Sequence, residues 1–223
     1  MTERLRETLR ADGFVRCPSV FDDSELEAVR RETEAMIDGW TAGRLRGDED
    51  YWSCEAGDPP VETLYRIHRF ETKSDEPRRL TAHERFRVLR DEVFADGSLP
   101  TECAVAIKVP GRGVEVPWHR DPVEADPFGV YNFSIYLDDS LPENGCLHVI
   151  PGSHLERGEV PKAMPAGAVP VAAAAGDVLV HDVALEHGSP PSDSAQGRRA
   201  VVIEFSAPGS RPGLRSGARA ALW

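Results

Sequence analysis

Two residues that could bind a metal stand two positions apart in the segment 116–122. His119 and Asp121 form the only His-x-Asp pattern in the chain. If the backbone there is extended, side chains two residues apart project from the same side of the strand. One imidazole and one carboxylate directed at the same point supply two of the three protein ligands of a two-histidine, one-carboxylate site for non-haem Fe(II). A second histidine from a distant strand would complete the site.

Two downstream histidines compete to be the third ligand. His187 is preceded by the apolar run 183–185 and Glu186 and followed by a Gly-Ser pair, which predicts a strand end before a turn. His181 ends the preceding strand-like run 176–180. The spacing favours His187 and leaves His181 as the alternative.

An arginine follows the histidines at a position where a buried anion could bind. Arg198 lies eleven residues after His187 and leads into the apolar run 200–205. An unpaired buried guanidinium is costly, and its planar fork suits a carboxylate bound through two hydrogen bonds. Its partner could be an Asp or Glu of this acidic chain or the far carboxylate of a dicarboxylic cosubstrate.

The composition is that of a globular protein, with 223 residues, 40% hydrophobic and 29% charged. The formal net charge of −12 argues against a nucleic-acid partner, because phosphate binding needs a basic face. No apolar run approaches the roughly 20 residues of a membrane span. The N-terminus lacks the apolar core of a secretory signal, and the four scattered cysteines are typical of reduced thiols. We therefore expect a cytoplasmic protein with a small-molecule partner; the sequence gives no prediction of the oligomeric state.

The first hundred residues carry helical patterns. Residues 3–11 are predicted to form a short amphipathic helix, a second helix is predicted to begin after Asp22, and a third over 82–94. The segment 41–60 is rich in Gly, Asp and Glu, which predicts an irregular loop. Its aromatic residues either anchor the loop to the core or form a lid over a substrate pocket.

After Pro100 short strand-like runs alternate with Gly and Pro turns. In residues 131–138 the odd positions are bulky and apolar and the even ones mostly polar, so one face could line a polar cavity. This pattern predicts a mainly β fold with N-terminal helices, of the jelly-roll or cupin-like barrel type. The candidate strands are 102–109, 114–119, 130–138, 146–150, 168–171, 177–181, 183–187 and 199–206.

These elements predict one catalytic domain over 1–207. Residues 1–100 would form a helical lead-in with lid loops, and residues 101–207 the jelly-roll core. The segment 208–223 is rich in Gly, Pro, Ser and Arg, which predicts a flexible tail.

The order His119-x-Asp121, His187, Arg198 resembles that of the Fe(II)/2-oxoglutarate-dependent oxygenases, specifically the phytanoyl-CoA dioxygenase-like branch. The similarity covers most of the chain and is densest from about residue 105 to 205. Further segments that look like this family are Gly13-Phe14-Val15, Trp118-His119-Arg120-Asp121, Glu143-Asn144-Gly145-Cys146-Leu147, Pro151-Gly152-Ser153-His154, Gly176-Asp177-Val178 and His187-Gly188-Ser189.

The resemblance implies a double-stranded β-helix that uses Fe(II), 2-oxoglutarate and dioxygen. It implies that 2-oxoglutarate chelates iron through its keto-acid end, while its far carboxylate is held by the protein. His154 matches a structural turn of the family and is expected not to bind metal. The residues implied are His119, Asp121 and His187 for the iron, and Arg198, Ser189, Asn132 and Ser134 for the cosubstrate.

The reaction implied by the resemblance is oxidative decarboxylation of 2-oxoglutarate to succinate and CO2, coupled to hydroxylation of an unactivated C–H bond. Related halogenases carry a small residue at the carboxylate position, so Asp121 implies hydroxylation rather than halogenation. A natural-product or amino-acid type of small molecule is the expected substrate. Residues whose type and expected position suit substrate contact are Trp52, Tyr65, Arg66, His68, Trp118, Arg120, Phe128 and Tyr131.

Two alternatives do not use 2-oxoglutarate: another cupin-like metal enzyme, and a non-catalytic barrel that binds a small molecule. The position of Arg198 counts against the first, and the intact ligand set counts against the second. The His119-Arg120-Asp121 triplet also matches a protein-kinase catalytic loop, but Asp126 stands where that motif needs Asn. We exclude the kinase.

Overall fold

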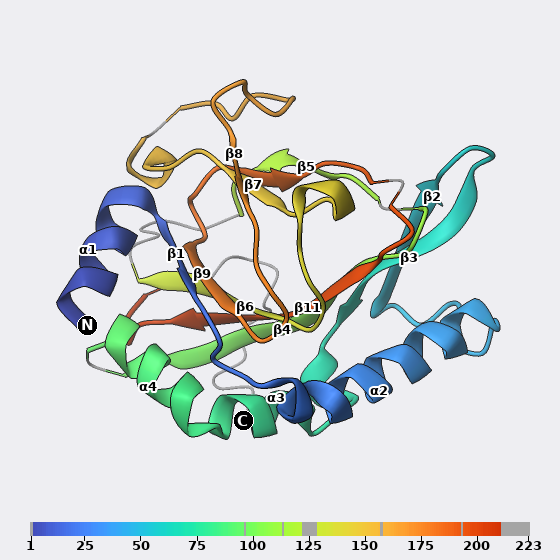
Figure 1. Ribbon diagram of the computed structural model, residues 1–223, viewed down its shortest axis with the longest axis horizontal. Coiled ribbons are helices and arrows are strands. Elements are labelled where there is room, and N and C mark those ends of the chain that lie inside the picture. Colours follow the sequence, from blue (N-terminus) through green and yellow to red (C-terminus); the bar gives the residue numbers. More distant parts are fainter. Residues whose placement is uncertain are drawn as a thin grey trace.

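Two antiparallel sheets face each other in the computed structural model, which describes residues 2–95, 97–112, 114–121, 129–156, 158–192 and 194–210 (Figure 1). The seven-stranded major sheet has the order β1-β9-β6-β11-β4-β3-β2, and the four-stranded minor sheet the order β5-β10-β7-β8. This confirms the predicted mainly β, jelly-roll class. The strands are β1 (Phe14–Cys17), β2 (Tyr51–Ala56), β3 (Val61–His68), β4 (Leu99–Lys108), β5 (Val116–His119), β6 (Val130–Tyr136), β7 (Leu147–Val149), β8 (Val169–Val171), β9 (Val178–Asp182), β10 (His187–Ser189) and β11 (Arg198–Ser206).

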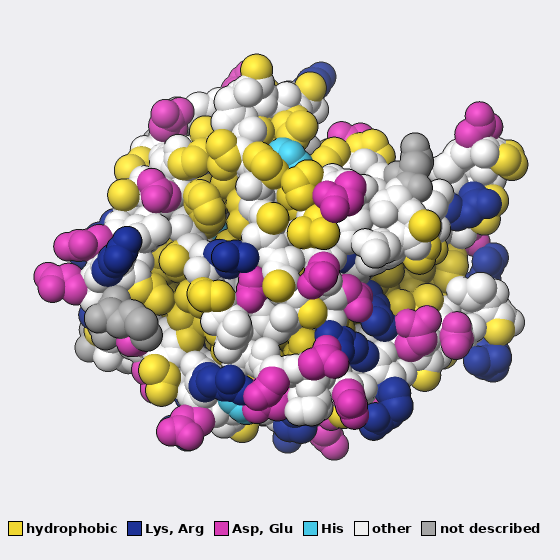
Figure 2. All heavy atoms as spheres, viewed as in Figure 1, with side chains coloured by type: hydrophobic (Ala, Val, Ile, Leu, Met, Phe, Trp, Pro, Cys, Tyr) yellow, Lys and Arg dark blue, Asp and Glu magenta, His cyan; other side chains and the backbone are white. Residues whose placement is uncertain are grey.

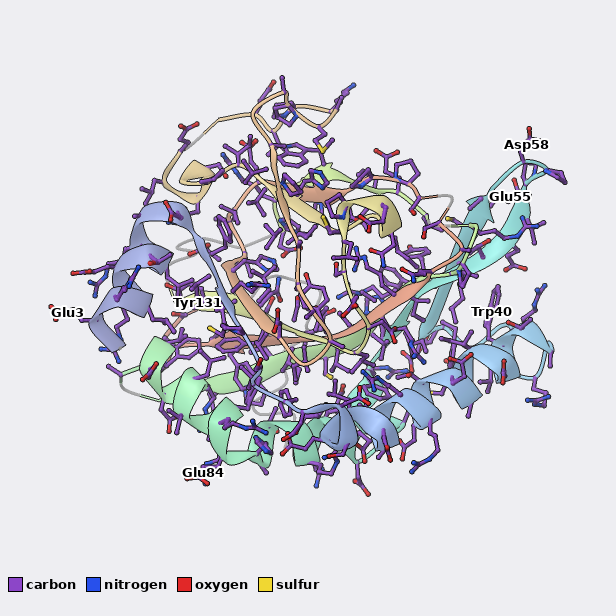
Figure 3. The ribbon with its side chains drawn as sticks, in the orientation of Figure 1. Glu3, Trp40, Glu55, Asp58, Glu84 and Tyr131 are labelled. Atoms are coloured by element: carbon purple, nitrogen blue, oxygen red, sulfur yellow. The ribbon has the colours of Figure 1, made fainter. Side chains whose placement is uncertain are left out.

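Four helices lie along the outer side of the major sheet, away from the minor sheet (Figure 1). They are α1 (Thr2–Asp12), α2 (Asp23–Thr41), α3 (Glu76–Ala82) and α4 (Glu84–Val93). The predicted start of α2 is confirmed, because the Glu25 carboxylate accepts a hydrogen bond of 2.7 Å from the Asp22 backbone N–H. Glu3 and Glu84, labelled in Figure 3, point outward from their helices. Acidic and basic side chains are interspersed on the face shown in Figure 2.

The two faces of the major sheet have different environments. On β6, Phe133 and Ile135 pack in the larger apolar core, to which residues of the helices also contribute. Asn132 and Ser134 occupy the alternate positions and face the minor sheet, as the sequence pattern predicted. Tyr136 belongs to a second, smaller core between the sheets, so one end of the barrel interior is apolar and the other is polar.

The segment 41–60 is not an irregular loop throughout, and that prediction is wrong. Residues 51–56 form β2, which pairs with β3 in an antiparallel hairpin that extends from the body of the fold (Figure 1). Glu55 and Asp58 mark the far end of this hairpin in Figure 3. The strand is half-buried and mixes aromatic, small and polar side chains without a regular apolar alternation, so pairing with β3 determines its structure.

Two other predicted elements differ from the structure. The expected helix 82–94 is α4, and a separate helix, α3, precedes it. The expected strand 183–187 is displaced to His187–Ser189, because residues 182–185 form a turn in which the Leu185 N–H donates to the Asp182 carbonyl at 3.0 Å. Of the predicted tail, residues 211–223 lie outside the described residues. No helix in the described ranges is both long and apolar enough to cross a membrane.

Candidate metal and cosubstrate site

His119, Asp121 and His187 come together where β5 pairs with β10. In this antiparallel pair His187 lies opposite His119. Asp121 follows β5 by two residues, and its backbone N–H donates to the Val183 carbonyl at 2.9 Å. Each of the three residues offers a ligand atom, and these atoms lie within 4.8 Å of one another. The structure thus brings together the three residues that the sequence favoured.

The imidazoles present their Nε2 atoms to the carboxylate. His119 Nε2 is 3.5 Å from Asp121 Oδ1, and His187 Nε2 is 3.9 Å from Asp121 Oδ2. His119 Nδ1 lies 2.7 Å from the Pro117 carbonyl, and His187 Nδ1 lies 2.8 Å from the Leu185 carbonyl. A proton on each Nδ1 satisfies these carbonyls and leaves the Nε2 lone pairs free for a metal. The donor set, two imidazoles and a carboxylate, fits Fe(II).

The charges in the group suit a cation. Burial alone would raise the pKa of Asp121, but the hydrogen bond with His119 and the nearby imidazoles hold it well below its usual range. Burial lowers the pKa of His187, which is 6% exposed. His119 is also desolvated, but its contact with Asp121 dominates and raises its pKa. The carboxylate is therefore ionised and available to a metal at neutral pH.

His181, the alternative ligand, lies behind the group. Its ring centroid is 4.9 Å from that of His187, and its Nε2 lies 3.3 Å from Asn132 Nδ2. Burial, with the nearby His187, lowers the pKa of His181 to about 3, so its ring is neutral. Asn132 Nδ2 donates to Asp121 Oδ2 at 2.8 Å, and it therefore orients a ligand of the group. Ser134 is buried two residues further along β6 on the same face.

Arg198 is buried, and no carboxylate of the described residues pairs with it. Its Nε and Nη2 donate to the Gly145 carbonyl at 3.0 and 2.6 Å, and its Nη2 also donates to Ser189 Oγ at 3.0 Å. Within the described ranges Arg198 forms no ion pair. Gly145 adopts φ +73°, and a Cβ there would lie 2.8 Å from the Pro190 carbonyl, so glycine is required to direct this carbonyl at the guanidinium.

A second buried cation adjoins Arg198. Lys108 lies opposite Arg198 where β4 pairs with β11, and its Nζ donates to the Val114 and Pro190 carbonyls at 2.5 and 2.6 Å. Burial, then repulsion by Arg198, lowers the pKa of Lys108 to about 7. The sequence did not single out Lys108, although a lysine that ends a buried strand is an unusual feature.

Polar residues continue across the inner face of the major sheet from Asn132. The register places Asn132 beside Glu204 and Glu204 beside Glu102. Glu102 accepts a hydrogen bond from Arg66 Nη2 at 3.0 Å and lies 3.5 Å from His68 Nδ1. Burial raises the pKa of Glu204 to about 7. Both glutamates were missed, although each is a charge within a strand that is otherwise mainly apolar.

Four of the residues expected to contact substrate fall on or near this polar surface. The Trp52 ring lies 3.7 Å from the His68 ring, centroid to centroid, and Tyr65 is half-buried on β3 beside Arg66. Arg66 Nε and His68 Nε2 are buried without a hydrogen-bond partner among the described residues. The Arg66 N–H as a donor, and His68 Nε2 as an acceptor when its Nδ1–H faces Glu102, are available to a bound molecule.

The other candidates do not face the metal group. Trp118 and Arg120 both bind Glu186 on the opposite side of β5, and Tyr131 packs in the outer core with its ring centroid 5.6 Å from that of Phe94 (Figure 3). Residue type suggested these three, but strand alternation turns them away. Phe128 lies outside the described residues.

His154 was expected to be structural. Its Nε2 lies 3.2 Å from the Arg10 carbonyl, and a Cβ at Gly13 would approach its Nδ1 to 2.5 Å. It therefore packs between the N-terminal segment and the barrel.

Several known proteins are similar to this chain in sequence or in fold. A model of the family described as phytanoyl-CoA dioxygenase (PhyH) matches residues 9–200. The dioxygenase lolE1 of Epichloe uncinata is 32% identical over 94% of this chain and 84% of that protein. A probable alpha-ketoglutarate-dependent hypophosphite dioxygenase of Stutzerimonas stutzeri is 24% identical over 96% of this chain and 82% of that protein. The crystal structure of AviO1 from Streptomyces viridochromogenes Tue57 has a TM-score of 0.80 and 35% identity, and covers 96% of this chain and 98% of that chain.

Proposed function

We propose that this chain hydroxylates an unactivated C–H bond of a small molecule. The chain belongs to the phytanoyl-CoA dioxygenase family and is an iron- and 2-oxoglutarate-dependent dioxygenase. In this proposal His119, Asp121 and His187 bind Fe(II). Arg198 and Ser189 bind the far carboxylate of 2-oxoglutarate. Asn132 and Ser134 line the inner face of β6 beside the cosubstrate.

The burial of Arg198 without a carboxylate carries the assignment of the cosubstrate. Ser189, which accepts from Arg198, lies two residues from His187 along β10. Residues at this spacing project from the same side of a strand and are separated by about 7 Å. A diacid that reaches the metal group at one end would therefore place its other carboxylate at the guanidinium, which suits bidentate binding.

The residues of the chain have distinct roles in the proposed reaction. Fe(II) held by the three ligands would supply the site at which dioxygen oxidatively decarboxylates 2-oxoglutarate to succinate and CO2. Asn132 keeps the Asp121 carboxylate oriented. The Pro117 carbonyl holds the His119 imidazole in one tautomer, and the Leu185 carbonyl does the same for His187. His119, Asp121 and His187 would occupy three positions on a bound metal and would leave the others to the cosubstrate and dioxygen.

The polar surface formed by Arg66, His68, Glu102 and Glu204 supports a polar substrate. Its buried nitrogen atoms, which lack a partner among the described residues, and its carboxylates suit a molecule that carries several hydrogen-bonding groups, such as an amino-acid derivative or a polar natural product. Asp121 occupies the carboxylate position, which favours hydroxylation over halogenation. Chlorinated product that depends on added chloride would contradict this choice.

The proposed activity is tested by following succinate release under air. The wild type with Fe(II) should consume 2-oxoglutarate and release one succinate for each molecule consumed, while Asp121→Ala should release none. Turnover of a substrate that is independent of 2-oxoglutarate would favour another cupin-like metal enzyme. Binding of Fe(II) and 2-oxoglutarate without any succinate would favour a non-catalytic barrel.

The cytoplasm is the proposed location. All four cysteines, Cys17, Cys54, Cys103 and Cys146, are free thiols. Free thiols persist in a reducing compartment. The partner is proposed to be a small molecule, with neither nucleic acid nor membrane involved.

A further inference from the structure

The residues on either side of the two ligand histidines contact one another on the side of β5 and β10 away from the metal group. His119 and His187 lie opposite each other, so Trp118 neighbours Gly188 and Arg120 neighbours Glu186. Trp118 and Arg120 alternate with His119 and Asp121 along the chain, and therefore point the other way.

One carboxylate joins these neighbours. Glu186 Oε2 accepts from Trp118 Nε1 at 3.2 Å, and Glu186 Oε1 accepts from Arg120 Nη2 at 2.8 Å. The Trp118 ring also packs on Gly188, where an added Cβ would lie 3.0 Å from Trp118 Cε3. Trp118 thus contacts the residues immediately before and after His187. We call Trp118, Arg120 and Glu186 the Glu186 cluster.

The Glu186 cluster is buried and held in place by the backbone. Glu186 is 8% exposed and Trp118 6%. The Glu186 N–H donates to Ser153 Oγ at 2.8 Å, and Arg120 also donates to the Ser153 and Gly158 carbonyls, both at 3.1 Å. Hydrogen bonds in a low-dielectric interior are strong and directional, so this cluster has little freedom to shift.

We propose that Glu186 is a positioning residue that sets the spacing of the metal ligands before the metal binds. Its carboxylate ties the β5 backbone that carries His119 and Asp121 to the β10 backbone that carries His187. Side chains hydrogen-bonded directly to a metal ligand typically change metal affinity by about 10- to 100-fold, and Glu186, which acts through the strands that carry the ligands, is expected at the lower end of that range. The inference rests on the proposed function, because it assumes that these three residues bind the metal.

The variants for the test are chosen to keep the shape of each side chain. Glu186→Gln retains the size but removes the charge that pairs with Arg120. Trp118→Phe retains a ring on Gly188 but removes the indole N–H. The matched control is Asp138→Asn, since Asp138 accepts from Arg199 Nε at 2.8 Å in a half-buried ion pair that contacts none of the three ligands.

The measurement is the dissociation constant of Co(II), used as an air-stable probe, together with the rate at which a chelator removes it. We expect the constant to rise roughly tenfold or more in Glu186→Gln and a few-fold in Trp118→Phe, with faster metal release in both. Asp138→Asn should bind Co(II) within about twofold of the wild type, even if its melting temperature falls.

The outcomes separate the two proposals. Folded Glu186→Gln that binds and releases Co(II) like the wild type would overturn the positioning role. Equal weakening in Asp138→Asn would also overturn it, since the effect would then reflect stability alone. If wild-type binding is insensitive to His119→Ala and His187→Ala, the metal site itself fails, whatever Glu186 does.

Discussion

Asn132 donates a hydrogen bond from Nδ2 to Asp121 Oδ2 at 2.8 Å, so an amide on the major sheet orients a ligand of the metal group beside the minor sheet. Replacing Asn132 by Leu keeps the branch at Cγ and the number of side-chain heavy atoms but removes the donor. We expect the Fe(II) dissociation constant, titrated without oxygen, to rise about tenfold. Ser134→Ala, a change on the same face of β6, is the control and should leave Fe(II) binding unchanged. Equal Fe(II) affinities of Asn132→Leu and the wild type would refute this role.

Arg198→Gln should weaken the binding of 2-oxoglutarate without changing the affinity for Fe(II). Removal of one partner of a buried, hydrogen-bonded charge pair typically costs 2–5 kcal/mol, so the KM for 2-oxoglutarate should rise roughly 100-fold. The Fe(II) dissociation constant should stay within about twofold of the wild type. Arg199→Gln is the control, because Arg199 pairs with Asp138 and Glu34 instead. An unchanged KM in Arg198→Gln would show that the carboxylate binds elsewhere.

Lys108 should make the binding of 2-oxoglutarate depend on pH. Burial and Arg198 lower the pKa of Lys108 to about 7 in the free protein. A dicarboxylate bound nearby would raise this pKa, because it stabilises the protonated amine. Binding therefore takes up a proton above pH 7, and the KM for 2-oxoglutarate should rise about tenfold between roughly pH 7 and 8.5. Lys108→Met should remove this slope relative to the wild type; identical slopes would exclude Lys108 as its source.

Glu204 should make the stability fall as the pH rises. Burial raises its pKa from 4.5 to about 7. Between these values the folded protein retains a proton that the unfolded chain has released, so the stabilisation is present below pH 4.5 and lost by about pH 7. Glu204→Gln keeps the shape and does not titrate. The free energy of unfolding of Glu204→Gln, measured in urea, should therefore rise relative to that of the wild type by roughly 2 kcal/mol between pH 5 and pH 8. A constant difference across this range would mean that Glu204 ionises normally.

The residues of the metal group could be predicted because their types are rare and their spacing is constrained. An extended backbone was enough to point His119 and Asp121 in the same direction, and His187 was predicted from its place at the end of a strand. Arg198 was singled out by its place before an apolar run, and Ser189 only by the resemblance to the family; their binding of the cosubstrate remains a proposal. The alternating pattern of 131–138 likewise indicated which face of β6 lines the interior, because side-chain environment has a period of two in a strand.

Other parts of the site depend on pairing between distant strands. The Gly145 carbonyl that binds Arg198 is a backbone group, and no residue type marks it. The contact of Glu186 with Arg120 arises only from the pairing of β10 with β5, which residue type does not reveal. Trp118 was expected to contact substrate because of its residue type, but it is adjacent to His119 in β5 and therefore faces the other side of the strand. The β2–β3 hairpin was missed because its outer strand lacks an apolar period.

Metal binding by four single variants tests the central assignment most directly. Fe(II) titrated without oxygen should bind the wild type at one site per chain, and His119→Ala, Asp121→Ala and His187→Ala should each lose that site. His181→Ala should keep one Fe(II) per chain with at most a few-fold loss of affinity, because its ring lies behind the ligands. Retention of Fe(II) by His187→Ala together with its loss in His181→Ala would contradict the account.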